Sequence, residues 1–375
     1  TNPPYMGTRS MPPALKARLA GEFPGYHHDL FLAFVARCAA LTTGSVAILT
    51  QQTLWYLKRF EHARRDLLAR GGLTAVAHLG HGVFEALGGE KATVMAWVWS
   101  EEHAGATRFY DLRSHRTPQQ KRRALMEVEP SVRDTASFAA IPAAPLAFWV
   151  APRLLRAFES GPRLADIAEV PGSQNKTGDN ARFVRRVELV DTDEIREARW
   201  LPSGTPDRRW VYYSKGGRYA PWWGNWDHVV DWSDDARAFY ASNPTSNLLD
   251  ARYWFREGLC YSDFGGKTFN ARWLPAGCVF DMAGPAIFVD GDDPDLLAAL
   301  LVALNSAGAR ELLNALNPTL HYQVRDVRNL PLPSWSDRVV SELAPLGHEL
   351  VRRARLGEEC GELEGEASRR CACYF

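Results

Sequence analysis

The residues Asn2-Pro3-Pro4-Tyr5 combine two hydrogen-bond acceptors with an aromatic ring. The Asn2 side-chain carbonyl and the Pro3 backbone carbonyl can each accept a hydrogen bond from an exocyclic amino group. Such bonds make the amino nitrogen of a purine a better nucleophile toward an activated methyl group. The prolines fix φ near about −65°, so the acceptors are in place before a substrate arrives, and Tyr5 offers a ring face to a base swung out of a duplex. The alternative is a proline-rich arm without a catalytic role.

The hydrophobic periodicity of the first hundred residues predicts alternating helices and strands. Helices are expected over residues 13–23, 30–41 and 60–70, with the second one capped by Asp29. Strands are expected over residues 45–50, 73–79 and 92–99, and a glycine-rich loop over residues 80–84. This alternation is typical of an α/β layered domain.

Changes in composition predict four regions. Residues 1–105 form the α/β domain, and residues 106–150, rich in alanine and proline near their end, form a helical linker. Residues 151–335, dense in tryptophan, form a second, α+β domain with helices over 295–306 and 309–316. Residues 336–375 form a helix over 339–355 and an irregular tail that begins at Arg369.

Composition limits the function classes. The formal net charge is zero, so binding to a polyanion depends on local patches of charge. No apolar stretch approaches the roughly 20 residues of a membrane span, and the six cysteines are scattered or terminal, which favours reduced thiols in the cytoplasm. Cys360, Cys371 and Cys373 lack zinc-ligand spacing, so no metal site is predicted.

The order and spacing of motifs in the first hundred residues resemble a known family. The motifs are Asn2-Pro3-Pro4-Tyr5-Met6-Gly7, Asp29-Leu30-Phe31 with Phe34, the run from Gly44 to Thr50 with Gln52, Phe60-Glu61 with Arg64, and Gly82-Val83-Phe84. Together they resemble the second half of a gamma-type adenine-N6 DNA methyltransferase.

Motifs in the second domain make the resemblance more specific. They are the run from Lys176 to Phe183, Lys215-Gly216-Gly217-Arg218, Trp223-Gly224-Asn225, Arg256-Glu257-Gly258, Phe269-Asn270-Ala271-Arg272, Leu304-Asn305-Ser306 and Asn329-Leu330-Pro331. They resemble the methyltransferases of BREX phage-defence systems, the PglX family, and related fused restriction-modification enzymes. The likeness covers about residues 1 to 333.

The resemblance implies S-adenosyl-L-methionine as methyl donor, with no metal needed for the transfer. Asn2, Pro3 and Pro4 would form the catalytic turn, and Tyr5 and Phe84 would stack on the target base. Leu30 and Phe34 would line the adenine pocket of the cofactor, although core packing explains them equally well. Phe84, too, would suit a hydrophobic core.

Two motifs of the family are missing from the sequence. The glycine-rich loop that holds the methionine part of the cofactor and the acidic residue that grips its ribose would both precede Asn2. The chain is therefore expected to be a C-terminal fragment: the second half of a Rossmann-like, S-adenosylmethionine-dependent domain, followed by a target-recognition domain. It is expected to be inactive alone.

Double-stranded DNA is the expected partner, and other defence-system proteins are a further possibility. Lys and Arg neutralise phosphates, and Arg and Asn also read base edges. The predicted DNA-binding residues are Lys176, Asn180, Arg182, Lys215 and Arg218. Three alternatives stay open: a non-catalytic DNA-recognition module, a degraded gene product, and a methyltransferase that acts on RNA or a protein glutamine.

Overall fold

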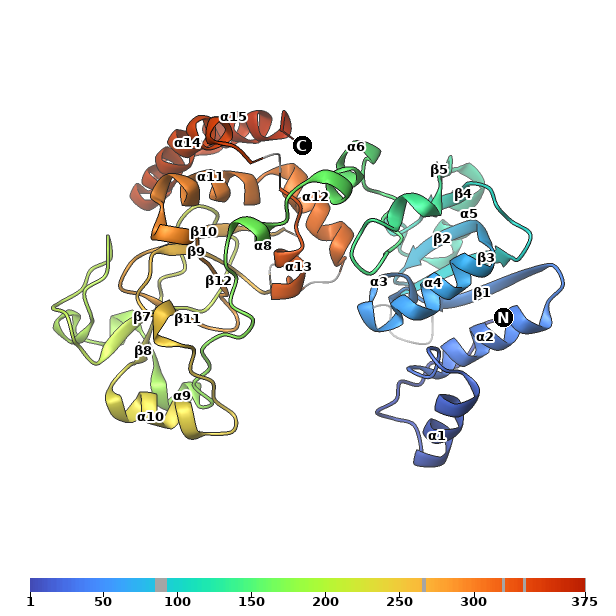
Figure 1. Cartoon of the computed structure of the whole chain (residues 1–375), viewed down its shortest axis with the longest axis horizontal. Helices are drawn as coiled ribbons and strands as arrows, with labels where there is room; N and C mark the ends of the chain where they lie inside the picture. Colours follow the sequence, from blue (N-terminus) through green and yellow to red (C-terminus); the bar gives the residue numbers. More distant parts are fainter. Residues whose placement is uncertain (85–92, 265–267, 319–320, 333–334, 375) are drawn as a thin grey trace. The chain divides into compact units, whose positions relative to one another are not determined.

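The computed structural model describes residues 1–84, 93–264, 268–318, 321–332 and 335–374, and it divides into two compact units. Residues Thr1–Leu155 form the first unit and Arg156–Phe375 the second (Figure 1). Both units mix helices and strands, as the sequence predicts. The elements of the first unit are α1 (Pro13–Glu22), α2 (Leu30–Leu41), β1 (Ser45–Gln51), α3 (Thr53–Tyr56), α4 (Glu61–Arg70), β2 (Gly72–Gly80), β3 (Val94–Ser100), β4 (Thr107–Asp111), α5 (Pro118–Glu127), β5 (Ser131–Arg133) and α6 (Pro152–Leu155).

A five-stranded sheet with the order β1-β3-β2-β4-β5 is the centre of the first unit. Because β3 pairs antiparallel to both β1 and β2, and β4 pairs parallel to β2, the strands β1, β2 and β4 run in one direction. Their carboxyl ends therefore meet at one edge of the sheet. In open α/β sheets this is the edge at which ligands bind.

One face of this sheet is covered by α3 and α4. The Trp99 indole N–H donates to the Leu67 carbonyl of α4 at 2.9 Å, and the rings of Trp97 and Trp55 of α3 meet edge to face at 5.3 Å. Both tryptophans of β3 are almost fully buried. The alternation of large buried and small residues along β3 thus assigns the tryptophans to the helix-covered face.

The stretch predicted to be a helical linker, residues 106–150, is instead part of the first unit. It supplies β4, α5 and β5, and β4 pairs with β2 beside the strands predicted from periodicity. The polar residues at Arg108 and Asp111 obscured the short strand, because only Thr107 and Phe109 are buried. The boundary between the units accordingly lies at Leu155.

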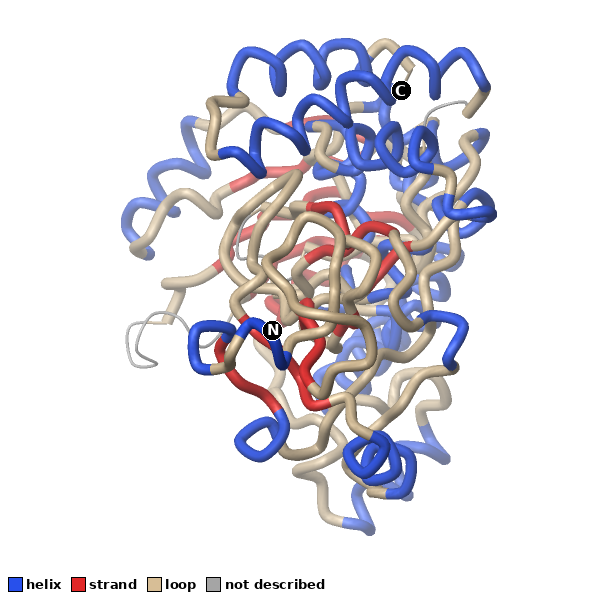
Figure 2. Tube along the Cα trace, turned by 90° about the vertical axis from the view of Figure 1, so that its left-hand side faces the viewer, coloured by secondary structure: helices blue, strands red, loops and turns tan. Residues whose placement is uncertain are grey.

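The second unit contains a four-stranded sheet and a three-stranded sheet, with orders β11-β7-β8-β6 and β10-β9-β12. Its helices α11, α14 and α15 lie side by side outside the strands (Figures 1 and 2). The elements are α7 (Ala157–Ser160), α8 (Leu164–Ile167), α9 (Asn180–Phe183), β6 (Val184–Arg186), β7 (Trp210–Ser214), β8 (His228–Asp231), α10 (Asp234–Ser242), β9 (Gly258–Tyr261), β10 (Ala271–Leu274), β11 (Val279–Phe280), β12 (Ala286–Ile287), α11 (Pro294–Leu304), α12 (Ala307–Leu316), α13 (Val324–Arg328), α14 (Asp337–Leu356) and α15 (Gly361–Ala372).

The prediction of an irregular C-terminal tail is wrong. Residues Gly361–Ala372 form helix α15, which buries Ala367 and Cys371 against the rest of the second unit. Its Glu364 carboxylate accepts a hydrogen bond from the Trp222 indole. The spacing of Ala367 and Cys371, four residues apart on one helix face, was the signal for this packing.

Candidate active site

The segment Asn2–Tyr5, which we call the acceptor loop, continues a strand-like pairing along β1. The amino group of Thr1 donates to the Ala47 carbonyl at 2.7 Å, and the Leu49 N–H donates to the Thr1 carbonyl at 2.9 Å. This is the pattern of a parallel ladder, in which Thr1 stands beside Ile48. The acceptor loop therefore leaves the sheet at the carboxyl end of β1.

Within the acceptor loop, the Tyr5 hydroxyl donates to the Asn2 side-chain oxygen at 3.1 Å. This bond fixes the orientation of an otherwise exposed amide. The Tyr5 ring meets the buried Phe31 ring edge to face at 5.9 Å, and burial raises the pKa of the Tyr5 hydroxyl. Asn2 thus lies exposed at the surface of the first unit, with its side-chain oxygen bonded to the Tyr5 hydroxyl.

Asp29 anchors the chain that follows the acceptor loop. Its carboxylate accepts from the Met6 N–H at 3.0 Å, and the Leu30 N–H donates back to the Met6 carbonyl at 3.0 Å. Asp29 is the N-cap residue of α2, as expected, although its carboxylate makes no cap hydrogen bond and binds the Met6 N–H instead. Burial raises the pKa of Asp29, although the bond from Met6 opposes this rise.

The loop that carries Phe84 leaves the sheet at the same edge. Gln51 of β1 and Gly80 of β2 both stand beside Val94 of β3, so the two strands end in line. Gly82 has φ +75°, and a Cβ there would lie 2.1 Å from the Arg116 carbonyl, so the position requires glycine. The half-buried Phe84 side chain follows two residues later.

Lys121 of α5 fastens the start of this loop. Its ammonium group donates to the backbone carbonyls of Leu79, Leu112 and His115. The side chain is buried, and burial lowers the Lys121 pKa. Sequence reasoning missed Lys121, because a single lysine in a polar helix carries no signal of burial.

His78 links the ends of β1 and β2 beneath the loops. Its Nε2 lies 2.7 Å from the Gln52 side-chain oxygen, and its Nδ1 lies 3.3 Å from the Tyr56 hydroxyl. Burial, and secondarily the positive charge of Arg113, lowers the pKa of His78 to about 3. The imidazole is therefore neutral at neutral pH.

We expect His78 to make folding pH-dependent. An unfolded chain protonates this histidine near its ordinary value of 6.5, whereas the folded state excludes the proton until about pH 3. Stability is then lost as the pH falls through this range, with a slope of up to about 1.4 kcal/mol per pH unit from this group. Denaturant unfolding at several pH values measures how the free energy of unfolding depends on pH. This dependence should be shallower for His78→Gln than for the unsubstituted chain. It should be unchanged for His81→Gln, an exposed position of the neighbouring loop. Equal slopes for His78→Gln and the unsubstituted chain would contradict the assignment.

The two residues predicted to line a cofactor pocket lie in different surroundings. Leu30 is half-buried and packs with Met6 against the cluster of Met11, Leu19 and Ala33. Phe34, one turn later on α2, leaves 42% of its surface exposed. The exposed Phe34 ring suits an apolar face of an adenine, whereas Leu30 has a sufficient structural role. Of the two residues, Phe34 is thus the more exposed and the better suited to contact a cofactor.

Three of the predicted DNA-binding residues are exposed in or shortly before α9. Asp179 caps this helix by accepting from the Arg182 N–H at 3.0 Å, and the Asn180 side-chain oxygen accepts from Thr177 at 2.8 Å. The Arg182 guanidinium lies over the Phe183 ring at 4.6 Å, which holds the side chain while leaving it exposed. Lys176 is exposed nearby in sequence.

The other two predicted DNA-binding residues differ from each other. Lys215 forms an ion pair with Asp281 and keeps only 18% of its side chain exposed, so its charge is largely neutralised within the fold. Arg218, beyond the positive-φ Gly216 and Gly217, is exposed. Of these two cations, Arg218 is thus exposed, whereas Lys215 is paired within the fold.

Sequence reasoning also missed Arg209. Its guanidinium binds the buried Asp231 carboxylate through two nitrogens, at 2.8 and 2.6 Å, and its side chain remains 62% exposed. Arg209 and Arg182 together line a hollow of about 350 Å³ beside Asp231. The adjacent pair Arg208-Arg209 was the available signal.

Comparison with solved structures shows that the chain shares its fold with parts of restriction-modification enzymes. The chain is similar to the type IIL restriction-modification enzyme MmeI in complex with DNA, with a TM-score of 0.62 at 9% identity, over 100% of this chain and 53% of that one. It is also similar to the DrdV–DNA complex, with a TM-score of 0.50 at 10% identity, over 94% of this chain and 44% of that one. No protein-family model matches the chain.

Similarity in sequence points to a narrower group of proteins than similarity in fold does. The chain is 29% identical over 362 residues to the adenine-specific methyltransferase PglX of Lacticaseibacillus casei (strain Zhang), and 27% identical over 337 residues to the adenine-specific methyltransferase BrxX of Escherichia coli O9:H4 (strain HS). These matches cover 92% and 88% of this chain but only 30% and 27% of the relatives. The chain is thus a homologue of the PglX and BrxX adenine-specific methyltransferases and spans less than a third of their length.

Among the described residues, no single helix is both long and apolar enough to cross a membrane. The helices α11 and α12 meet that test only as a pair, and they are bent by 70° at the break between them.

Proposed function

We propose that this chain supplies the base-binding part of an adenine-N6 DNA methyltransferase, together with a DNA-recognition unit. The observation that carries the proposal is the acceptor loop at the carboxyl edge of the parallel strands, with the exposed Asn2 amide oriented by Tyr5. The homology to adenine-specific methyltransferases supports it. The first unit is then part of a Rossmann-like methyltransferase domain.

In this proposal the acceptor loop binds an adenine that has left the duplex. The Asn2 side-chain oxygen and the Pro3 carbonyl accept the two amino hydrogens, and the amino nitrogen becomes more electron-rich. When bound, S-adenosylmethionine would supply an electrophilic methyl group. The amino nitrogen held by Asn2 and Pro3 would receive this group as the carbon–sulfur bond breaks, and one amino proton would pass to solvent. Tyr5 and Phe84, on two loops of one sheet edge, flank the base.

A chimaera tests this function. The chain replaces the matching region of the L. casei PglX, and the chimaera is expressed in L. casei in place of the parent enzyme. We expect N6-methyladenine in genomic DNA, read by modification-sensitive sequencing. A folded chimaera that leaves the DNA unmethylated, in cells where the parent enzyme methylates it, would overturn the proposal. The isolated chain should transfer no radiolabelled methyl group to DNA.

We propose that the exposed cations Lys176, Arg182 and Arg218 contact DNA phosphates. Replacing all three by alanine should lower duplex affinity by on the order of tenfold per lost contact near 0.1 M salt. The slope of log affinity against log salt should fall by about one for each contact. Fluorescence anisotropy at several salt concentrations measures both quantities. Arg338→Ala, which removes an 81% exposed side chain from the same unit, serves as the control. An unchanged salt slope would exclude these residues from the interface.

A further inference from the structure

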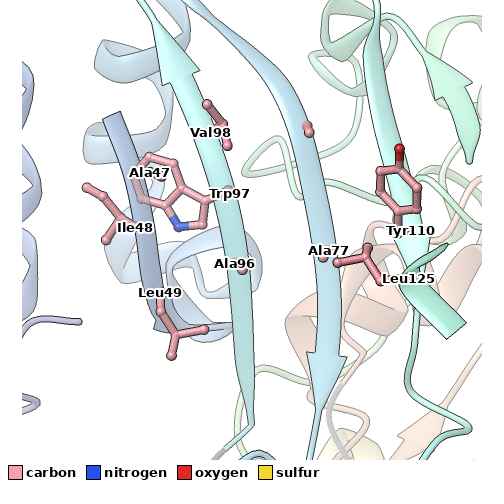
Figure 3. Close-up of a pocket in the computed structure, with 10 residues that line it drawn as sticks. Ala47, Ile48, Leu49, Ala77, Ala96, Trp97, Val98, Tyr110 and Leu125 are labelled. Carbon is pink, nitrogen blue, oxygen red and sulfur yellow. The ribbon is translucent and has the colours of Figure 1, made fainter. Parts of the chain in front are cut away.

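Two hollows of the molecule differ in the chemistry of their walls. The hollow over the sheet of the first unit is lined largely by apolar side chains, among them Ala47, Ala96 and Val98 (Figure 3). The hollow of about 350 Å³ in the second unit has charged and polar groups on its walls, and we call it the arginine hollow. These groups belong to Arg182, Arg209, Asp231, Ser233 and Asp235. Such a site selects its ligand by the direction of hydrogen bonds.

Arg209 is held in one orientation at the arginine hollow. Its Nε and Nη2 groups donate to the same oxygen, Oδ2 of Asp231, at 2.8 and 2.6 Å. Its guanidinium lies over the Trp210 ring at 5.2 Å, and its backbone carbonyl accepts from the Trp232 N–H at 2.7 Å. An arginine that is oriented before its ligand arrives loses little conformational entropy on binding.

Asp231, which orients Arg209, is itself fixed. The residue is buried, and its Oδ1 accepts from the N–H of Ser233 at 3.0 Å and from the Ser233 hydroxyl at 2.7 Å. Burial opposes ionisation, but the hydrogen bonds from Arg209 and Ser233 hold the pKa of Asp231 below its ordinary value. The carboxylate is therefore charged at neutral pH, and the pair that it forms with Arg209 has no net charge.

Arg209 keeps one edge of its guanidinium for a ligand. The bonds to Asp231 use the edge formed by Nε and Nη2. Among the residues that the structure describes, Nη1 has no hydrogen-bond partner, and the Arg209 side chain is 62% exposed. The edge formed by Nη1 and Nη2 thus offers two parallel N–H donors. Their spacing matches the O6 and N7 acceptors that guanine presents in the major groove of DNA.

The charges at the arginine hollow favour a base over a phosphate. Phosphate binding depends on positive charge that the protein has not already neutralised. Asp231 neutralises Arg209, and the exposed Asp235 carboxylate on the same wall disfavours a phosphate. A base edge has no net charge and is recognised by directional hydrogen bonds, which the neutral pair retains. Asp235 can also accept from the amino group of the cytosine that pairs with the guanine.

We propose that Arg209 reads a guanine in the DNA sequence that the second unit recognises. This inference rests on the proposed function, since it requires the second unit to be the DNA-recognition unit. Arg209 would then determine specificity, whereas Lys176, Arg182 and Arg218 would supply affinity for any sequence. Asp231 is a positioning residue, because it orients Arg209 without touching the DNA.

Sequence selection with the isolated chain tests the proposal without any need for catalysis. The chain is incubated with a pool of duplexes that share a randomised central segment, and the bound duplexes are sequenced. We expect a preferred sequence with a guanine at one position that Arg209→Met makes indifferent to the base, while the other positions keep their preference. One arginine–guanine pair accounts for a preference on the order of tenfold or more.

The matched control is Arg208→Met, at the exposed position beside Arg209. The Arg208 Nε donates to the Thr205 hydroxyl at 2.7 Å rather than to Asp231. This variant should keep the preference at every position. A selected sequence that is the same with and without Arg209→Met would overturn the proposal.

A modified base detects the contact without relying on the fold of a variant. In 7-deazaguanine a C–H group replaces N7, so one of the two acceptors is lost while base pairing is kept. At the selected guanine it should lower the affinity of the unsubstituted chain by on the order of fivefold and leave that of Arg209→Met unchanged. Fluorescence anisotropy measures both affinities. An equal loss for both proteins, or no loss for either, would contradict the assignment.

The remaining outcomes separate this proposal from the proposed function. If Arg209→Met weakens binding to every duplex equally and lowers the salt slope by about one, Arg209 contacts a phosphate and the proposal fails. If the chain binds duplexes without sequence preference, the reading of guanine fails while the phosphate contacts stand. If the chain binds no duplex, both fail. If selection depends on Arg209 but the chimaera methylates no DNA, the catalytic function fails and the reading of guanine stands.

Discussion

Asn2→Ala is expected to abolish most methyl transfer in the chimaera. The substitution removes one of two preorganised acceptors for the amino group, a loss that costs about 10²–10³ in rate in enzymes with comparable sites. Asn2→Asp keeps an oxygen where the amide oxygen lies and should retain more activity than Asn2→Ala. Single-turnover transfer of a radiolabelled methyl group to duplex DNA measures the rates.

The matched control is Ser10→Ala, which removes an exposed hydroxyl a few residues beyond the acceptor loop. Its backbone bond to Gly7 survives the change, so the loop should keep its shape. DNA affinity should be similar for Asn2→Ala and the unsubstituted chimaera, because the phosphate contacts are assigned to the second unit. Asn2→Ala with full activity would exclude the amide from the chemistry.

Arg64→Met should lower the free energy of unfolding of the first unit more than the substitution of any exposed residue. The fully buried guanidinium donates to the backbone carbonyls of Leu54, Leu57 (2.9 Å) and Ala143 (2.6 Å). Burial lowers the pKa of Arg64 to about 10, so the group stays protonated at neutral pH. Removing the donors leaves buried carbonyls unpaired, at a cost of about 3–5 kcal/mol.

Arg65→Met provides a control at the adjacent position. Its side chain is 49% exposed and pairs with Glu61 at 2.9 Å, so its loss should cost under about 1 kcal/mol. Denaturant unfolding followed by tryptophan fluorescence compares the two variants. Similar unfolding midpoints for Arg64→Met and Arg65→Met would show that the buried hydrogen bonds contribute little. Ala143 has φ +67°, and Arg64 is the side chain that holds this unusual backbone in place.

The sequence predicted the elements whose apolar spacing is regular. The ends of α1, α2 and α4 differ from expectation by one residue or less, and β1 and β2 were recognised from short apolar runs. Residues 106–150 were wrongly predicted to be a helical linker because the pairing of β4 is not visible in the local sequence. Its partner, β2, lies about thirty residues upstream, and a contact at that distance leaves no periodic signal. The packing of α15 did leave a local signal, the four-residue spacing of Ala367 and Cys371, which was overlooked.

The candidate site was predictable where a motif concentrates the chemistry in one segment. Asn2 and Tyr5 were picked out together because they lie in one short motif, whereas the hydrogen bond between their side chains was not predicted. The supports of the loops come from distant elements, as with Lys121, which reaches Leu79 from α5. Lys215 was predicted to bind DNA, but its charge is paired with Asp281. The two residues are far apart in the chain, so nothing in the local sequence indicated this ion pair.

The division of the chain between Leu155 and Arg156 has an evolutionary consequence. The hydrogen bonds of Asn2, Asp29 and Arg64 all close within the first unit, and those of Arg209 within the second. Under the proposed function, substitutions can accumulate in one unit without breaking the internal bonds of the other. A lineage could therefore change which sites it marks on DNA while inheriting an unaltered methylating apparatus.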